Sequence, residues 1–182
     1  MIIGITGTNG AGKGTVVDYL VKNKGFKHYS VRDFLYEEID RRGMPRDRNS
    51  TNIVGNDLRK VHGAGYIFEQ LLARAQAAGG DAVVESMRAI GEARYFKSKR
   101  ALIWAVDADR KLRYERAVLR GSDTDKVIYE QFVAQEDKEM AQTAEYDMNV
   151  FGVMELADAV LANNGTPEEL YEQVELALQK GA

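Results

Sequence analysis

The sequence Gly-Thr-Asn-Gly-Ala-Gly-Lys-Gly-Thr, at residues 7–15, constrains this chain more than any other stretch. It follows an apolar run, 1–5, that predicts a short buried strand, and it precedes 16–21, where apolar residues have helical spacing. A strand, a glycine-rich loop and a helix in that order are the setting of a phosphate-binding P-loop. In such a loop, backbone N–H groups point at phosphate oxygens and the helix N-terminus adds the positive end of its dipole.

The loop matches the pattern G-x-x-x-x-G-K with one departure. Lys13 is placed to reach the terminal phosphates of a nucleotide as a point charge, and we expect it to be exposed in the empty site. Gly14 follows it, so the hydroxyl expected to contact Mg²⁺ comes one place later, at Thr15. A glycine-rich turn that binds nothing is the alternative, and the strand, lysine and helix together argue against it. The residues expected to hold the nucleotide are Gly7, Asn9, Gly10, Ala11, Gly12, Lys13, Gly14 and Thr15.

The composition narrows the class of protein. The chain has 182 residues, enough for one α/β domain with a substantial core. A net charge of −3 lacks the basic excess of a general nucleic-acid binder, and the absence of cysteine excludes disulfides and thiolate chemistry. No apolar run approaches a membrane span, and the first strand begins at the start methionine, leaving no room for a signal peptide. We therefore expect a cytoplasmic protein, a monomer or homodimer, that binds a small-molecule nucleotide and neither nucleic acid nor a membrane.

Strand and helix patterns alternate along the chain. Strands are predicted near 1–5, 26–30, 81–85, 101–106 and 159–162, and helices near 12–24, 31–42, 51–61, 66–77, 90–99, 109–120, 126–144 and from 166 onward. This order predicts a single domain, 1–182, with a three-layer α/β fold: a parallel sheet of about five strands with helices on both faces. Ligands of such sheets bind at the carboxyl ends of the strands. The residues expected to face that crevice are 6–14, Ser30, 85–88, Asp107 and Asn163.

Two charged residues follow the third predicted strand. Glu85 ends the strand, where a carboxylate beside the P-loop could hold Mg²⁺ directly or through water, so we assign the metal to Thr15 and Glu85. Arg88 comes three residues later, and its forked guanidinium suits a phosphate. The alternatives are a solvated acid and a surface ion pair without further function.

Three arginines share one face of the helix predicted near 109–120. Arg113, Arg116 and Arg120 stand at i, i+3 and i+7. Like charges in one stripe repel unless an anion faces them, so the stripe predicts a lid helix that closes on transferring phosphates. The alternative is a solvated face relieved by Asp109 and Glu115.

Two regions extend a minimal nucleotide-binding unit. The segment 109–144 is the predicted lid region, and the segment 31–78 inserts three helices between the second and third strands. Insertions at the carboxyl ends of strands commonly build a specificity pocket. A structural role on a charged helix surface is the alternative for each side chain alone. The candidates for contact with an acceptor are Arg32, Asp33, Arg59, Arg88 and Tyr66.

At this point the chain resembles nucleotide kinases of the adenylate-kinase type. Its loop, G-x-x-G-x-G-K-G-T, resembles the P-loop of adenylate kinases and related nucleotide kinases. More closely, the chain resembles an archaeal adenylate-kinase-related family that shares features with dephospho-coenzyme A kinases. The segment 30–35 is similar to the family's S-x-G-D-x-L, 84–88 to V-I-D-G-x-R, and 157–165 to the A-D-x-V-I-x-N-x-G of dephospho-coenzyme A kinases.

The resemblance implies roles for single residues. It implies that Glu85 lies near magnesium and Arg88 on the acceptor phosphate. It implies that Arg116 and Arg120 are lid arginines. It also implies that the segment 157–165, which contains Asn163, runs beside the adenine of ATP.

Three positions depart from the family pattern. Glu85 stands in place of aspartate, Arg32 in place of glycine, and Tyr36 where the family often has arginine. The last two lie in the acceptor-binding region, so the departures bear on the acceptor more than on the reaction.

Together these observations predict an ATP- and Mg²⁺-dependent kinase that phosphorylates a nucleoside or deoxynucleoside monophosphate. The residues expected to act in catalysis are Lys13, Arg88, Arg116 and Arg120. Catalysis would be positioning plus electrostatics, because an acceptor phosphate is already an anionic nucleophile. One alternative is a dephospho-coenzyme A kinase, in which Asp33 or Glu85 would take the proton of a ribose hydroxyl. The other is a nucleotide-binding switch with little turnover.

Overall fold

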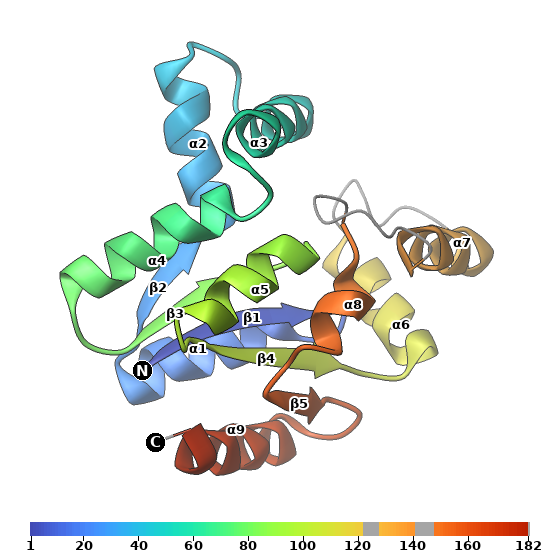
Figure 1. Cartoon of the computed structure of the whole chain (residues 1–182). Coiled ribbons are helices and arrows are strands. Elements are labelled where there is room, and N and C mark those ends of the chain that lie inside the picture. Colours follow the sequence, from blue (N-terminus) through green and yellow to red (C-terminus); the bar gives the residue numbers. More distant parts are fainter. Residues whose placement is uncertain (122–127, 141–147, 182) are drawn as a thin grey trace.

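Five parallel strands form one sheet in the order β2-β3-β1-β4-β5 in the computed structural model, which describes residues 1–121, 128–140 and 148–181 (Figure 1). The strands are β1 (Ile2–Gly7), β2 (Lys27–Ser30), β3 (Ala82–Glu85), β4 (Leu102–Asp107) and β5 (Ala159–Ala162). The parallel five-stranded sheet and its α/β class are as predicted. Because all strands run the same way, their carboxyl ends meet at one edge, as expected for a ligand crevice.

Helices cover both faces of the sheet. They are α1 (Lys13–Lys24), α2 (Val31–Arg41), α3 (Arg48–His62), α4 (Tyr66–Ala78), α5 (Ile90–Ser98), α6 (Arg110–Arg120), α7 (Tyr129–Met140), α8 (Val150–Met154) and α9 (Pro167–Gly181). Figure 1 shows α1 and α9 beneath the sheet and α4, α5 and α8 above it. Within the described residues, no helix is both long and apolar enough to span a membrane.

Two hydrophobic clusters hold the three layers together. One cluster packs α1 and α9 against one face of the sheet and contains Val83. The other packs α2, α3, α4, α5 and α8 against the opposite face and contains Val84. Successive side chains of a strand point to opposite faces, so Val83 packs in one cluster and Val84 in the other. Both side chains are fully buried. This two-sided burial is why the predicted strand near 81–85 has no polar face.

The insertion between β2 and β3 consists of three helices, α2, α3 and α4, as predicted (Figure 1). However, α3 begins at Arg48, three residues before the predicted start. The segment 49–52 is therefore helical. Asp47 caps the helix, with its carboxylate accepting the Ser50 N–H at 2.7 Å, and this cap lies upstream of the polar residues that we expected to start the helix.

The sequence analysis did not predict α8. The residue in the sequence that marks the start of α8 is Asn149. Its side chain accepts the Gly152 N–H at 2.8 Å and caps this helix of five residues. Such a short helix lacks the repeated apolar spacing on which the other predictions depended. The helix predicted over 126–144 corresponds to α7, Tyr129–Met140, and the rest of that prediction falls at 126–127 and 141–144, outside the described residues.

A strained residue follows β3 directly. Ser86 has a φ of 74°, in the left-handed region that side chains with a Cβ rarely adopt. Together with Arg100, it is one of two such non-glycine residues in the described part of the chain. Strain of this kind persists only where surrounding contacts impose it, and here the next residue, Met87, donates its N–H to Ile5 of β1 at 3.1 Å.

We predict that Ser86→Gly stabilises the protein. Glycine adopts this φ without strain, and the relief exceeds the entropy that glycine adds to the unfolded chain, so the free energy of unfolding should rise by about 0.5–1 kcal/mol. Urea denaturation measures the change. Ser98→Gly, in the last turn of α5, is the matched control and should lower the same quantity. A loss of stability in Ser86→Gly would contradict the strain.

Candidate functional site

The glycine-rich loop joins β1 to α1, as predicted, and two of its glycines are packed against neighbouring chain. A Cβ at Gly10 would lie 2.2 Å from the backbone oxygen of Arg113 on α6. A Cβ at Gly12 would lie 2.2 Å from Nδ2 of Asn163, and Gly12 has a φ of 95°. The loop therefore needs glycine at both places, because its backbone approaches its neighbours too closely for a side chain.

Lys13 turns back onto the loop. Its Nζ donates to the carbonyl oxygens of Gly7 at 2.8 Å and Thr8 at 2.7 Å. The side chain is half-buried, so the expectation that it is exposed was wrong, and the reason is that these carbonyls draw the ammonium group inward. Lys13 therefore already lies over the loop that would hold a phosphate.

The pKa of Lys13 records the electrostatics of the site. Burial, the largest cause, lowers the pKa from 10.5 to about 8. The positive charges of Arg88, Arg120 and Arg113 lower it as well. Several cations thus converge on one half-buried point, which is a favourable place for an anion.

The candidate metal ligands are half-buried and close to the loop. Glu85 ends β3, and His28 Nε2 lies 3.5 Å from its Oε1. Hydrogen bonding to His28 is the main reason that the pKa of Glu85 is lowered, so the carboxylate is charged at neutral pH. The described residues contain no cluster of three or more His, Asp or Glu side chains for a metal. One carboxylate and a hydroxyl from Thr15 are the kind of sparse oxygen set that Mg²⁺ uses when phosphates and water complete its shell.

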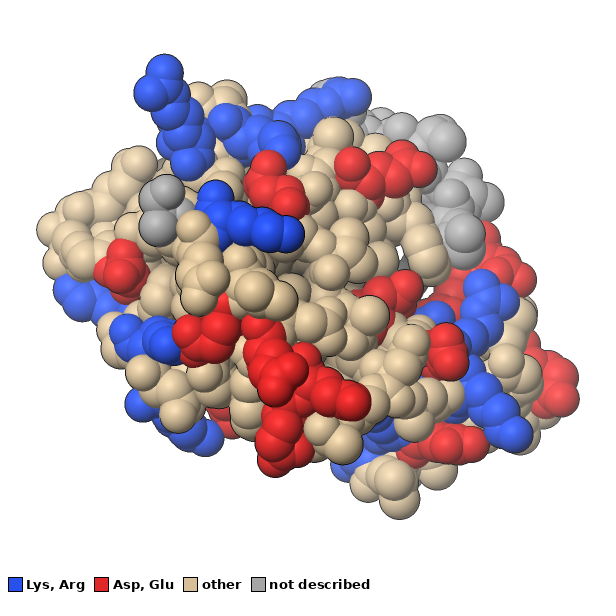
Figure 2. Space-filling model, turned by 90° about the horizontal axis from the view of Figure 1, so that it is seen from below, with Lys and Arg blue, Asp and Glu red and all other residues tan. Residues whose placement is uncertain are grey.

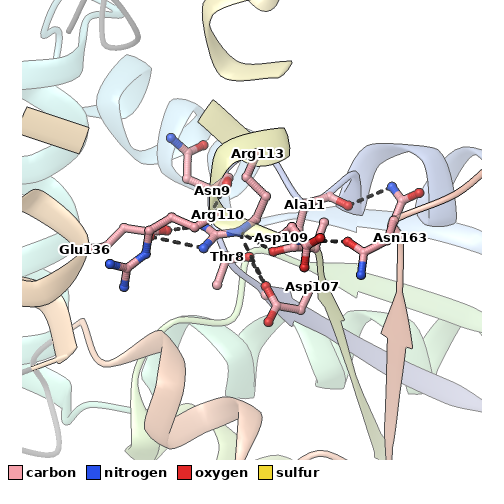
Figure 3. A network of polar contacts seen from close by, with 12 residues as sticks. Thr8, Asn9, Ala11, Asp107, Asp109, Arg110, Arg113, Glu136 and Asn163 are labelled. Carbon is pink, nitrogen blue, oxygen red and sulfur yellow. Dashed lines mark hydrogen bonds and ion pairs between the residues drawn. The ribbon is translucent and has the colours of Figure 1, made fainter. Parts of the chain in front are cut away.

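The end of β4 supports the loop from the other side. The Thr8 hydroxyl donates to Asp107 Oδ1 at 2.6 Å, and Arg113 Nε lies 3.6 Å from the same oxygen (Figure 3). Thr8 is buried. Asp107 therefore faces the crevice, as expected, and it orients the loop through Thr8.

Asn163 ties the turn after β5 to the loop. Its buried side-chain amide donates to the Ala11 carbonyl at 2.8 Å, as Figure 3 shows. Arg116 Nη1 in turn donates to the Asn163 carbonyl at 2.8 Å. The amide is thus engaged with the loop itself, and the contact to adenine implied by the resemblance stays a prediction.

The three arginines of the predicted stripe lie on α6 in different surroundings, unlike the uniform stripe expected from their spacing. Arg113 is buried, with 4% of its surface exposed, and its guanidinium forms an ion pair with Glu136 of α7 (Figure 3). It also donates to the Ala108 carbonyl at 2.7 Å and the Asn9 carbonyl at 3.3 Å. Glu136 thus balances the charge of Arg113 within the protein.

The other two arginines remain near the loop surface. Arg116 is half-buried against Asn163, and Arg120 is exposed, with Nη2 at 3.0 Å from Oδ1 of Asn9. Because Gly10 packs on the backbone of Arg113, α6 lies directly on the loop. Both side chains therefore stand at the rim of the candidate nucleotide site.

The candidate acceptor residues lie on α2, on α3 and in the turn after β3. Arg32 and Asp33 are exposed in the first turn of α2, and Ser30 caps their N–H groups at 3.1 and 3.4 Å. Arg88 is exposed after β3, with Nη1 at 3.9 Å from Sδ of Met148. Arg59 differs, because its guanidinium meets the buried carboxylate of Glu92 at 3.3 Å.

Two aromatic side chains of the insertion make structural contacts. Tyr66 stacks on His62 with ring centroids 4.3 Å apart, and the Arg46 guanidinium lies 5.2 Å from the ring of Tyr36. Tyr36, which departs from the family pattern, therefore packs within the insertion. The sequence analysis did not single out Glu92 or Glu136, whose partners lie on other helices.

Similar proteins include members of one family and homologues of nearly the same length. The family model described as "AAA domain" matches residues 3–143. A UPF0200 protein of Pyrococcus horikoshii is 29% identical, with 99% of this chain and 97% of the relative covered. A UPF0200 protein of Thermococcus kodakarensis is also 29% identical, with 96% and 94% covered.

Solved structures share the fold at low sequence identity. A dephospho-CoA kinase from Campylobacter jejuni has a TM-score of 0.58 at 14% identity, covering 100% of this chain and 97% of that one. A shikimate kinase from Aquifex aeolicus has a TM-score of 0.56 at 18% identity, covering 99% and 97%. The adenylate-kinase type implied by the resemblance is not among these findings, whereas a P-loop domain of the kinase fold is. The chain belongs to the AAA domain family, as a P-loop domain with the fold of small-molecule kinases.

Proposed function

We propose that this protein is an ATP-dependent kinase that transfers a phosphoryl group to a nucleoside or deoxynucleoside monophosphate. The observation that carries the proposal is that Lys13 lies half-buried over the loop, bonded to the Gly7 and Thr8 carbonyls, with Arg88 and Arg120 near enough for their charges to act on it. Burial, the largest cause, and then the charges of these arginines lower the pKa of Lys13 to about 8. Such a concentration of positive charge suits two phosphate-bearing ligands that must approach each other.

In this proposal the loop binds the donor. Backbone N–H groups of 10–15 and the N-terminus of α1 hold its phosphates, and Lys13 leaves the Gly7 and Thr8 carbonyls to pair with them. Mg²⁺, when bound to Thr15 and Glu85, would neutralise charge on the phosphates. Arg116 and Arg120, at the rim, stabilise the charge that develops during transfer.

The acceptor binds between the loop and the insertion. Arg88 receives its phosphate, with Arg32 and Asp33 of α2 beside it. A phosphate acceptor needs no general base, because the attacking oxygen is already anionic.

A hydroxyl acceptor, as in a dephospho-coenzyme A kinase, is the second candidate. The observation that favours it is Asp33, an exposed carboxylate on α2 to which no described residue donates a hydrogen bond. Such a carboxylate is available to take a proton from a hydroxyl. Of the two candidates, the arginines favour the monophosphate.

One face of the molecule lacks the charge of a nucleic-acid site. On the face seen in Figure 2, acidic side chains gather across the middle and basic side chains lie mainly toward the margins. A nucleic-acid site would need the reverse arrangement on this face.

The proposal predicts ADP formation that depends on a nucleoside monophosphate. A coupled ADP assay with ATP, across ribo- and deoxynucleoside monophosphates and dephospho-coenzyme A, measures it. Lys13→Met should lower the rate about 10²–10³-fold without unfolding the protein, because removing a partly buried charge near three arginines costs the fold little. Turnover of dephospho-coenzyme A alone would establish the second candidate, and full activity of folded Lys13→Met would refute the P-loop assignment.

The lowered pKa of Lys13 predicts that ATP binding weakens at alkaline pH. Phosphates favour the charged lysine, so the bound form has the higher pKa, and affinity should fall about tenfold per pH unit above pH 8. Calorimetry at pH 9 in buffers of different ionisation enthalpy should detect uptake of about one proton per ATP.

Lys13→Arg is the matched control for this effect. Arginine keeps its charge at pH 9, so its complex should take up no proton at this position. A wild-type affinity that stays constant up to pH 9.5 would contradict the lowered pKa.

Two arginines of α6 should respond differently to substitution. Arg113→Met leaves Glu136 with only Arg110 as a guanidinium partner, so the free energy of unfolding should fall by about 3 kcal/mol. Arg120→Ala, at an exposed position, should change stability by less than about 0.5 kcal/mol but lower kcat more than it raises KM for ATP. Chemical denaturation and steady-state kinetics separate the two effects. Unchanged kinetics in Arg120→Ala would show that it has no part in the transfer.

A further inference from the structure

The backbone of Arg88 is held on both sides. Its N–H donates to Oε2 of Glu92 at 2.9 Å, and its carbonyl accepts the Asn149 N–H at 2.8 Å. The preceding residue is fixed as well, because the Thr6 hydroxyl donates to the Met87 carbonyl at 2.9 Å. An exposed side chain thus leaves from a turn whose backbone is secured by β1, α5 and the start of α8.

Glu92 is the charged member of this arrangement. It is fully buried, and its Oε2 also accepts the Ala89 N–H at 3.1 Å. Its other oxygen, Oε1, lies 3.4 Å from Nε and 3.3 Å from Nη2 of Arg59. Burial raises the pKa of Glu92, while Arg59 and the two N–H groups act in the opposite direction. The carboxylate is therefore tolerated in the core only because each oxygen has a donor.

Helix capping alone does not explain why Glu92 is buried. An acid in the first turn that accepts the N–H of the cap residue is common, and it usually stays at the surface. Here the second oxygen pairs with a residue of α3, which belongs to the insertion. Arg59 is itself packed against Gly55, where a Cβ would lie 3.2 Å from Nη1. The pair therefore connects the insertion to the turn that presents Arg88.

We propose that Glu92 is a positioning residue for the acceptor: through Arg59 it fixes α3 of the insertion relative to the backbone of Arg88. The inference rests on the proposed function, in which Arg88 binds the acceptor phosphate. It also changes the role expected for Arg59, which acts through Glu92 and not by direct contact with the acceptor. When the backbone of an arginine is already fixed, the side chain binds a phosphate without further ordering of the backbone. This preorganisation lowers the entropic cost of binding the acceptor.

The test compares Glu92→Gln and Arg59→Met with Arg42→Met. The control also removes a guanidinium ion pair from the insertion, since Arg42 joins Asp57 at 2.7 Å, but it has no link to Arg88. We expect both test variants to raise KM for the nucleoside monophosphate about tenfold or more and to leave KM for ATP within about twofold. The double variant should be no worse than the poorer single variant, because the two residues act as one unit. The control should show wild-type constants.

Amide hydrogen exchange of the protein without ligands gives a readout that is independent of activity. Exchange at Arg88 and Ala89 should accelerate about tenfold or more in Arg59→Met and stay unchanged in Arg42→Met. Arg59→Met alone is a sufficient test if Glu92→Gln does not fold. Unchanged exchange and an unchanged acceptor KM in Arg59→Met would overturn the inference, as would equal rises in both KM values. If the wild type uses no nucleoside monophosphate, the proposed function fails, and the exchange data alone decide whether the pair holds the turn.

Discussion

The close approach of the glycine-rich loop to its neighbours is the constraint on which the rest of the site depends. Gly10 packs on the backbone of α6, and Gly12 packs on the side chain of Asn163. These contacts leave no room for a Cβ, so the loop is shaped by the elements around it as much as by its own residues. The helix that carries Arg116 and Arg120 and the turn that follows β5 are placed by the same two contacts. Their positions relative to the N–H groups of the loop are therefore a consequence of packing.

A second constraint is the distribution of charge. The site gathers positive charge, as the lowered pKa of Lys13 records, and such a gathering opposes folding when no anion is bound. Two buried acids offset part of it. Glu136 pairs with Arg113 behind the loop, and Glu92 pairs with Arg59 behind the turn that carries Arg88. These two buried acids thus neutralise Arg113 and Arg59 inside the protein.

In the proposed function the insertion is the part of the fold that binds the acceptor. The fold is shared with a shikimate kinase and a dephospho-CoA kinase, at identities below 20%. In this chain α2 to α4 pack on the sheet and on α5 through one hydrophobic cluster, and Arg59 of α3 also pairs with the buried Glu92 of α5. On the two proposals made above, side chains of α2 would select the acceptor, and the Arg59–Glu92 pair would hold the turn that carries Arg88.

The sequence alone determined the strand–loop–helix start, the parallel sheet, the three-helix insertion and the edge at which the site lies. These features follow from local periodicity, glycine and capping residues, and strand direction, which act within a few residues of each other. Tertiary structure decided the remaining features. The spacing of Arg113, Arg116 and Arg120 predicted one common face, but only the packing of α7 buries Arg113 against Glu136. Likewise, the inward turn of Lys13 and the pairing of Arg59 with Glu92 join residues through space. The free energy of a buried charge depends on partners that folding brings from distant positions, and no pattern within a single helix contains them.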